Sequence, residues 1–397
     1  HNTADEPATV PVQIDLRGGA EYVSFWEFSG PGSSDEPKPW AEKTLAWSVG
    51  SPEGNLLVKP GDGAALAVAT DLARPQWLPL EGHWEAEVTV GAGESRQFSV
   101  CAAIGPQEKA IEEALGAIAA GEQAVREAAH GWLRATEDIF TRLPVLKASD
   151  ERLVRFYNRS LTHLLINQWR VPELILDPYY STGGINGGCV CCYLWDFGEP
   201  WELLALYDPE AVKRHILQFL TVDITHHFAF VPTTGEAFGP WYPVNQEKII
   251  FLIYYYVLLT GDSDFLHQQA GEKRVIDWVL YHAMYRDHPE LPVALIDYGK
   301  GNNHLELRGT FRYDNHLPDL NARRYANYMA AHTLAGIAGV EAPDLPSRAA
   351  ALKPLVKRLM WMGLVAGLES VASIIAIRAA IQIWKRMYGE DPPGVDG

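Results

Sequence analysis

Residues 245–261 read NQEKIIFLIYYYVLLTG, and this stretch decides the fold. Asn245 can open a helix, and the Thr260-Gly261 pair can close it. The run between them is apolar all round rather than on one face. A helix that is hydrophobic on every side is usually buried, and this one is too short to span a membrane. The stretch therefore predicts a core helix of a globular helical domain.

Similar helix starts recur on both sides of this core helix. They combine a capping side chain or a proline with acids in the first turn, at residues 149–151, 208–210, 263 and 319 or 321. The helix that starts at Ser263 is expected to run to about Tyr285, and the one after Asp319 to end at Gly339. No strand signal of comparable strength interrupts them. Successive helical hairpins joined by long polar loops predict a mainly α fold, an α/α toroid.

The first hundred residues have a different pattern. Short alternating segments such as WEAEVTV and RQFSVCA are separated by Gly, Pro and Asp turns, which is typical of antiparallel strands. From Gln107 to Phe140 the composition changes to Ala, Glu and Leu, which favours helix. We therefore expect a small β-sandwich over residues 1–103, a helical linker over 104–142 and an α/α toroid catalytic domain over 143–397.

Composition restricts the partners. The 397 residues carry a net charge of −17, which disfavours nucleic acid and anionic membranes. The 11% aromatic content suits apolar cores and also the C–H faces of sugars. Residues 359–384 form a second long apolar run, but Glu369, Arg378 and Gln382 inside it are costly in lipid, so we expect another core helix. No signal peptide is visible at His1, and we expect a cytoplasmic location.

The sequence predicts neither a metal site nor a cofactor. Cys189, Cys191 and Cys192 match no zinc spacing, and four cysteines in a chain of this length make no disulfide framework. We expect reduced, buried thiols. The glycines of residues 183–188 are not spaced as a phosphate loop, which argues against nucleotide binding.

Residues 287–321, DHPELPVALIDYGKGNNHLELRGTFRYDNHLPDLN, have no hydrophobic period and are predicted to form a long functional loop between two helices. Two further aromatic loops lie at residues 179–201 and 231–248. In the first, the alternative to a sugar-binding wall is a capped helix start with Trp195 and Trp201 in the core. In the second loop, Asn245, Glu247 and Lys248 are explained equally well as helix-capping residues and as ligands of a substrate. From the three loops we expect the following residues to bind substrate: Trp195, Asp196, Glu199, Trp201, Trp241, Tyr242, Tyr298, His304, Arg308 and His316.

Glycoside cleavage needs two carboxyl groups on either side of the scissile bond, and one of them must hold a proton near neutral pH. Asp297 lies between Ile296 and Tyr298, and Glu306 lies between two leucines. Such apolar flanks favour the protonated form. Asp319 follows Pro318 at a helix start, where capping explains it better. Asp297 and Glu306 are therefore the candidate catalytic residues.

Trp195-Asp196, the helix start at Asp208-Pro209 and the run LIDYGKGNN…ELR…NHLPDLNA resemble the six-hairpin glycosidases, above all the trehalases and the processing α-glucosidases. The likeness covers roughly residues 143–339. It implies an α/α toroid after a β-sandwich, with Asp297 as general acid and Glu306 as the fallback. It also implies that Trp195-Asp196 forms the wall of the subsite nearest the cleaved bond.

The chain departs from this family in two ways. The family toroid has twelve helices, whereas about seven precede Gly339, so we expect the toroid to be incomplete at its C-terminal end. The family's second carboxylate lies in an aromatic, glycine-rich context that the residues after Arg358 do not offer. The catalytic base is therefore unassigned.

These residues favour a glycoside hydrolase that acts on a neutral glucoside or oligosaccharide by inversion. Three alternatives stay open. The first is a disaccharide phosphorylase, with Lys300, Arg308 and Arg312 binding phosphate. The second is a polysaccharide lyase that uses Tyr298 or Tyr313 with His304, although the negative charge disfavours a uronate substrate. The third is an inactive carbohydrate-binding protein.

Overall fold

The computed structural model describes residues 1–16, 48–60, 65–78, 83–172, 174–182, 191–239, 241–288, 290–298 and 315–389. These residues form two compact units, residues 1–154 and 155–397. Helix α3 (Glu151–Ile166) begins in the first unit and belongs mostly to the second. None of the described helices is both long enough and apolar enough to cross a membrane.

The first unit contains two antiparallel sheets. One has the order β1-β6-β5 and the other β2-β3-β4-β7. The strands are β1 (Ala8–Asp15), β2 (Ser48–Val49), β3 (Leu56–Pro60), β4 (Ala65–Thr70), β5 (Gln76–Leu78), β6 (His83–Val90) and β7 (Val100–Gly105). Leu57 and Val68 of the second sheet pack against Trp84 of the first, and all three are buried. The prediction of antiparallel strands is confirmed for the described residues.

Two helices complete this unit, α1 (Gln107–Ala120) and α2 (Glu122–Arg142). Ala110 and Ala114 of α1 pack on the alternate face of β3 and β4, against Leu56 and Ala67. The second sheet is therefore covered by the other sheet on one face and by α1 on the other.

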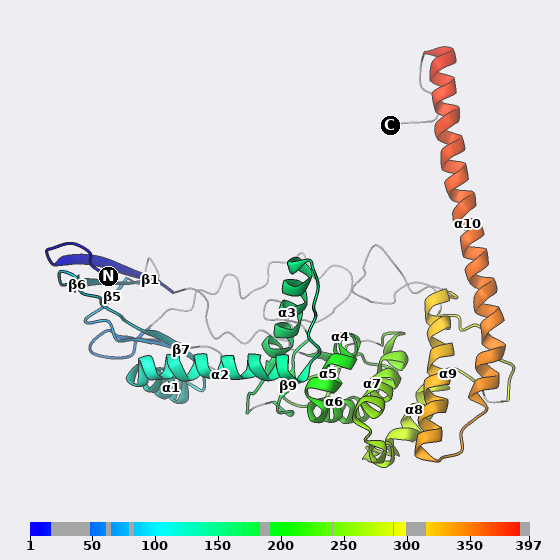
Figure 1. The fold of residues 1–397 in the computed structure, drawn as a ribbon, viewed down its shortest axis with the longest axis horizontal. Helices are drawn as coiled ribbons and strands as arrows, with labels where there is room; N and C mark the ends of the chain where they lie inside the picture. Colours follow the sequence, from blue (N-terminus) through cyan, green and yellow to red (C-terminus); the bar gives the residue numbers. More distant parts are fainter. Residues whose placement is uncertain are drawn as a thin grey trace. The chain divides into compact units, whose positions relative to one another are not determined.

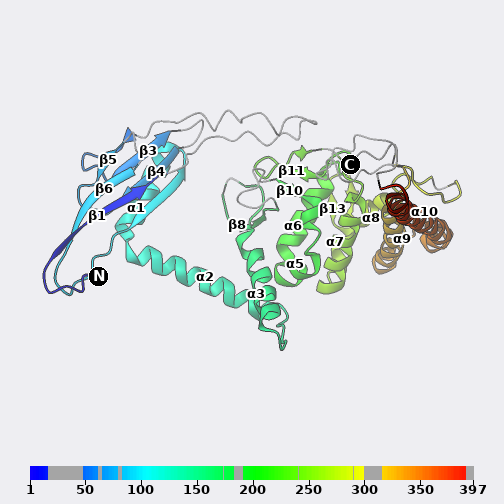
Figure 2. The same cartoon turned by 90° about the horizontal axis from the view of Figure 1, so that it is seen from above.

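The second unit is built mainly of helices, which lie side by side in Figures 1 and 2. They are α4 (Leu194–Phe197), α5 (Trp201–Tyr207), α6 (Pro209–Thr221), α7 (Asn245–Thr260), α8 (Val275–Ala283), α9 (Pro318–Ala338) and α10 (Leu345–Tyr388). Short strand pairs occupy the connections: β8 (Gln168–Trp169) with β9 (Tyr179–Tyr180), β10 (Cys192–Tyr193) with β11 (Ala229–Phe230) and β12 (Ala237–Phe238), and β13 (Gln269–Ala270) with β14 (Lys273–Arg274).

The helices pack in two rows. Helices α5, α7 and α9 contact one another in turn, while α6 and α8 contact each other and α7. Helix α7 lies at the centre, and Ile249, Ile253 and Tyr256 are at most 1% exposed. The core helix predicted from its all-round hydrophobicity is confirmed. Stacked helical hairpins produce such rows, and a closed toroid stays a prediction.

The expected helix from Ser263 to Tyr285 is interrupted. The structure has a 3₁₀ turn, η2 (Ser263–His267), then the β13–β14 hairpin, and only then α8. Gly271 at the hairpin turn has φ +61°, a conformation that glycine adopts without strain. The prediction of one continuous helix was wrong because this turn signal was overlooked.

The expectation that residues 359–384 form a core helix is also wrong. They belong to α10, whose first turns pack on α9 through buried Leu345, Leu352 and Val356. Beyond that point Trp361, Leu368 and Ile375 are more than 60% exposed. At 1.5 Å per residue, the 44 residues of α10 are about twice as long as the 21 of α9. The C-terminal half of α10 therefore extends past α9 (Figure 1).

A buried histidine joins α6 to β9. The backbone N–H of Tyr180 donates to His215 Nε2 at 3.1 Å, so the ring proton must lie on Nδ1, which donates to Ala211 O at 2.8 Å. The imidazole stacks on Phe197 at 4.6 Å between ring centroids. Burial lowers the pKa of His215 to about 4. His215 is therefore neutral in the folded chain and has a structural role.

This histidine predicts that the protein loses stability in mild acid. Below about pH 6.5 the unfolded chain binds a proton that native His215 refuses until about pH 4, so stability falls over this window as the pH decreases. The slope is about 1.4 kcal/mol per pH unit for one group. We expect His215→Gln, whose amide can still donate and accept, to reduce this slope in urea unfolding. The exposed control His332→Gln should keep it, and equal slopes in both variants would contradict the assignment.

Candidate functional site

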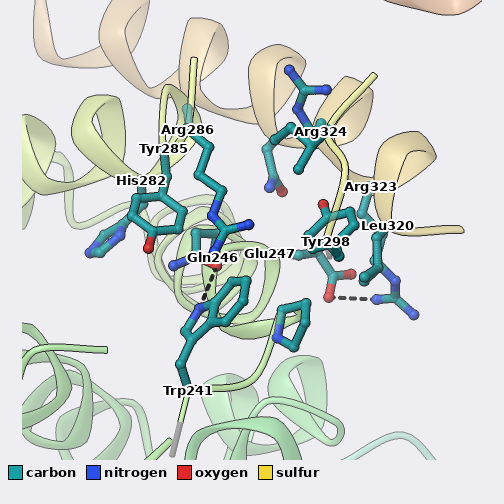
Figure 3. Close-up of a pocket in the computed structure, with 14 residues that line it drawn as sticks. Trp241, Gln246, Glu247, His282, Tyr285, Arg286, Tyr298, Leu320, Arg323 and Arg324 are labelled. Atoms are coloured by element: carbon teal, nitrogen blue, oxygen red, sulfur yellow. Dashed lines mark hydrogen bonds and ion pairs between the residues drawn. The ribbon is translucent and has the colours of Figure 1, made fainter. Parts of the chain in front are cut away.

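A pocket lies between α7, α8, α9 and the segment that precedes α9 (Figure 3). The hollow comprises about 370 Å³ of space, which includes space open to solvent. Its lining is rich in aromatic and polar side chains: Trp241, Gln246, Glu247, His282, Tyr285, Arg286, Tyr298, Arg323, Arg324 and Asn327. Two of the three loops that were expected to bind substrate contribute to the pocket. Trp241 comes from the loop before α7, and Tyr298 comes from the loop before α9.

Aromatic rings form one wall of the pocket. Trp241 and Tyr298 are stacked with their centroids 6.4 Å apart and their planes at 19°. Tyr285 meets Trp241 edge-on at 6.1 Å. Burial raises the pKa of Tyr298 to about 12, so its hydroxyl stays protonated. Flat rings of this kind suit the C–H faces of a sugar ring.

A chain of charged groups joins the pocket to Glu199, which follows the helix α4 that carries Trp195. Lys248 Nζ lies 2.7 Å from Glu199 Oε1 and 3.8 Å from Glu247 Oε2. Arg323 Nη1 continues the chain to Glu247 at 2.6 Å. The indole N–H of Trp195 donates to Glu199 Oε1 at 2.9 Å. Lys248 is only 4% exposed, and a buried lysine must have such carboxylate partners.

Two carboxyl groups at this end of the chain, those of Asp196 and Glu199, differ in acidity. Desolvation by the surrounding protein raises the pKa of Asp196, and the nearby charge of Glu199 acts in the same direction. Desolvation acts the same way on Glu199, but the Lys248 ammonium group and the Trp195 N–H outweigh it and lower the pKa of Glu199. Such a difference is typical of an acid and its ionised partner. Asp196 also lines a second hollow of about 550 Å³, with Tyr180, Thr182 and Phe197.

Hydrogen bonds from α9 hold the segment that carries Asp297. Asn321 Oδ1 accepts from Ile296 N at 2.9 Å, and Asn321 Nδ2 donates to Ile296 O at 3.2 Å. Arg324 Nη1 donates to Ala294 O at 2.8 Å. Asp297 follows directly, with an exposed side chain, and the next residue, Tyr298, faces the pocket. Asn321, itself fully buried, therefore fixes the backbone next to the candidate acid.

Asp297 has apolar neighbours in sequence, but its own side chain is exposed rather than enclosed by them. Asp319 was expected to cap α9. The structure instead places Leu317 at the N-cap without a side-chain bond, Pro318 at the first helical position and Asp319 within the first turn. There its negative charge interacts favourably with the helix dipole. The assignment of Asp319 as the N-cap is therefore corrected.

The structure separates the expected substrate-binding residues into groups. Trp241 and Tyr298 meet in the pocket, and Glu199 is bonded to Trp195 at the end of the charged chain. Tyr242 does not line the pocket: it is 2% exposed and stacks on Phe228 at 4.5 Å, and its binding role stays a prediction. His316 is exposed. Trp201 begins α5, but its side chain is outside the described part, as are residues His304, Glu306 and Arg308.

Sequence reasoning missed the contributions of the segment after α8 and of α9: Tyr285, Arg286, Arg323, Arg324 and Asn327. A signal was present, because charged and amide residues recur with Leu320 at spacings of three and four along one face of α9. Among the described residues, no three carboxylate, imidazole or thiol groups gather closely enough to hold a metal ion. Cys191 and Cys192 are buried, as expected.

Comparison with known proteins gives little further information. No protein-family model matches the chain, and no curated protein matches it. Solved structures do match, among them one described as "Putative kojibiose phosphorylase from human microbiome", with 11% sequence identity and a TM-score of 0.45. The match covers 80% of this chain and 48% of that one, so the chain spans about half the length of that protein. A likeness this distant carries no argument about activity.

Proposed function

We propose that the protein is a glycoside-cleaving enzyme whose substrate occupies the pocket between α7, α8 and α9. The observation that supports this most is the stacked Trp241–Tyr298 wall beside side-chain polar atoms that lack partners among the described residues. Gln246 Nε2, His282 Nδ1 and Asn327 Oδ1 are such atoms, and all three residues line the pocket. An aromatic face with nearby unpaired donors and acceptors is what a ring with many hydroxyl groups requires.

The proposed chemistry uses Asp297 as the proton donor, with Glu306 as the fallback. Asp297 gives its proton to the glycosidic oxygen as the bond from the anomeric carbon to that oxygen breaks. A water oxygen bonds to the anomeric carbon and loses a proton to a second carboxylate. Among the described carboxylates, Glu199 suits this second role because Lys248 connects it to Glu247 of the pocket lining, and the Lys248 ammonium group helps to lower its pKa. A neutral oligosaccharide is the proposed substrate.

A phosphorylase is the second candidate, and Arg286 is the observation that favours it. Its guanidinium lies 4.5 Å from the Trp241 ring and pairs with no described carboxylate. In phosphorolysis a phosphate oxygen attacks the anomeric carbon, the glycosidic bond breaks, and the leaving oxygen takes the proton of Asp297. The products are a sugar 1-phosphate and a free sugar.

A screen of α- and β-linked disaccharides with and without inorganic phosphate tests both candidates. We expect one linkage class to release free monosaccharide without phosphate. Sugar 1-phosphate that forms only with phosphate would replace the hydrolase by the phosphorylase. Glycan binding without turnover would instead indicate a carbohydrate-binding protein, and products with ultraviolet absorbance from a new double bond would indicate a lyase.

A further inference from the structure

We propose that the pocket contains an oxyanion subsite, with the Arg286 guanidinium and the Gln246 amide as its donors. The subsite takes a phosphate group or a carboxylate that lies beside a hydroxyl group. Any part that the anion takes in a reaction rests on the proposed function, whereas the binding of the anion does not.

Arg286 is the cation of the subsite. It belongs to the segment after α8, has φ +66° and is exposed. A non-glycine residue in this region is strained. The guanidinium lies 4.5 Å from the Trp241 ring, 5.8 Å from the Tyr285 ring and 5.9 Å from the Tyr298 ring. Three rings thus hold one arginine above the pocket (Figure 3).

The other charges of the lining are already balanced. Arg323 is paired with Glu247 at 2.6 Å, and Lys248 adds a second cation to Glu247 at 3.8 Å. Arg324 is paired with Asp287 at 2.6 Å. Arg286 alone among these arginines has no carboxylate partner in the described part of the chain. The lining therefore has a surplus positive charge where Arg286 faces the cavity.

Gln246 supplies a neutral donor whose orientation is fixed. Its Oε1 accepts from Trp241 Nε1 at 3.3 Å, so the amide nitrogen must point the other way. That nitrogen has no partner among the described residues, although Gln246 is only 6% exposed. An unsatisfied buried donor is costly, and a bound acceptor removes the cost. In the view of Figure 3, Gln246 and Arg286 both appear above Trp241.

Asn327 limits the class of anion. Its Oδ1 is a buried acceptor without a described partner, and the residue is 4% exposed. An acceptor needs a hydroxyl or a protonated oxygen opposite it. Monohydrogen phosphate and a sugar carboxylate with neighbouring hydroxyls both combine an oxyanion with such a donor. A guanidinium suits either, because its fork matches phosphate and carboxylate geometry.

The test measures binding by the full chain at constant ionic strength with three probes: inorganic phosphate, glucuronate and glucose. Calorimetric titration is performed on the parent, Arg286→Gln and Lys273→Gln. Lys273 is a matched control, because its ammonium group lies over the Trp278 ring at 4.3 Å but lines no part of the pocket. We expect phosphate or glucuronate to bind more tightly than glucose, and Arg286→Gln to weaken that binding about tenfold or more, since bonds to charged groups are strong. Lys273→Gln should change it less than about twofold.

The two anionic probes distinguish which class of ligand the subsite binds. Tight binding of phosphate alone supports a phosphate co-substrate, while tight binding of glucuronate alone supports an acidic sugar. Equal binding of glucose and glucuronate without phosphate binding, or anion binding that Arg286→Gln does not change, would overturn the subsite. Anion binding without cleavage of any disaccharide would contradict only the proposed function, and cleavage without anion binding would contradict only the subsite.

Discussion

Replacement of Asp297 by Asn is expected to lower kcat for an unactivated disaccharide by about 10²–10⁴-fold, with little change in KM. The amide keeps the shape of the carboxyl group but has no acidic proton for the leaving oxygen. The same variant should lose far less activity on an aryl glycoside with an acidic phenol, because that leaving group departs without protonation. A loss confined to poor leaving groups is the signature of a general acid, and a misfolded site would lose both activities.

Asp319→Asn is the matched control for this experiment. Asp319 is exposed and lies in the first turn of α9, close in sequence to the Asn321 that holds Ile296. It should keep activity within about threefold of the parent. If Asp297→Asn cleaves the disaccharide as fast as the parent while Glu306→Gln or Asp196→Asn does not, the acid is one of those residues. Asp196 is the described rival because burial raises its pKa.

Removal of Arg324 is expected to destabilise the helical unit by about 3 kcal/mol or more. The guanidinium is 7% exposed and pairs with Asp287, which is 6% exposed. In Arg324→Ala the buried carboxylate keeps the Tyr328 hydroxyl and Arg348, the latter at 3.7 Å. The remaining partners place the loss near the low end of the range for a broken buried pair. For a unit of this size the thermal midpoint should fall by about 6–12 °C.

Arg274→Ala provides the matched comparison. Arg274 and Asp277 form an equally close pair at 2.8 Å, but their side chains are 42% and 36% exposed. A solvent-exposed pair contributes about 0–1 kcal/mol, so the midpoint should move little. Equal shifts in the two variants, followed by circular dichroism, would show that the Arg324–Asp287 pair is no more important than a surface contact.

The predicted helices that proved right have strong local signals. Asp208 accepts from the backbone N–H of Ala211 at the start of α6, and Gly261 ends α7 in the left-handed conformation. Helix α10 failed as a core helix for a non-local reason. Its apolar content is indistinguishable from that of a buried helix, and only the length of the neighbouring helix decides how much of it is covered.

The sequence predicted residues of the candidate site only where aromatic and polar side chains are dense in a loop. Trp241 and Tyr298 were identified from aromatic density, and the fold brings them into contact across a gap in the sequence. Tyr242 has the same local signal but faces Phe228, because adjacent residues in an extended segment point to opposite sides. The sequence indicates neither the φ angle of +66° at Arg286 nor the position of its guanidinium over Trp241.

Helix α9 has a consequence beyond stability. Arg324 lines the pocket and at the same time donates to the backbone just before Asp297. A ligand that orders the pocket face of this side chain restricts the groups bonded to its other nitrogens. Thermodynamic linkage makes such an effect reciprocal. We therefore expect affinity for the ligand and alignment of the proposed acid to be coupled through Arg324.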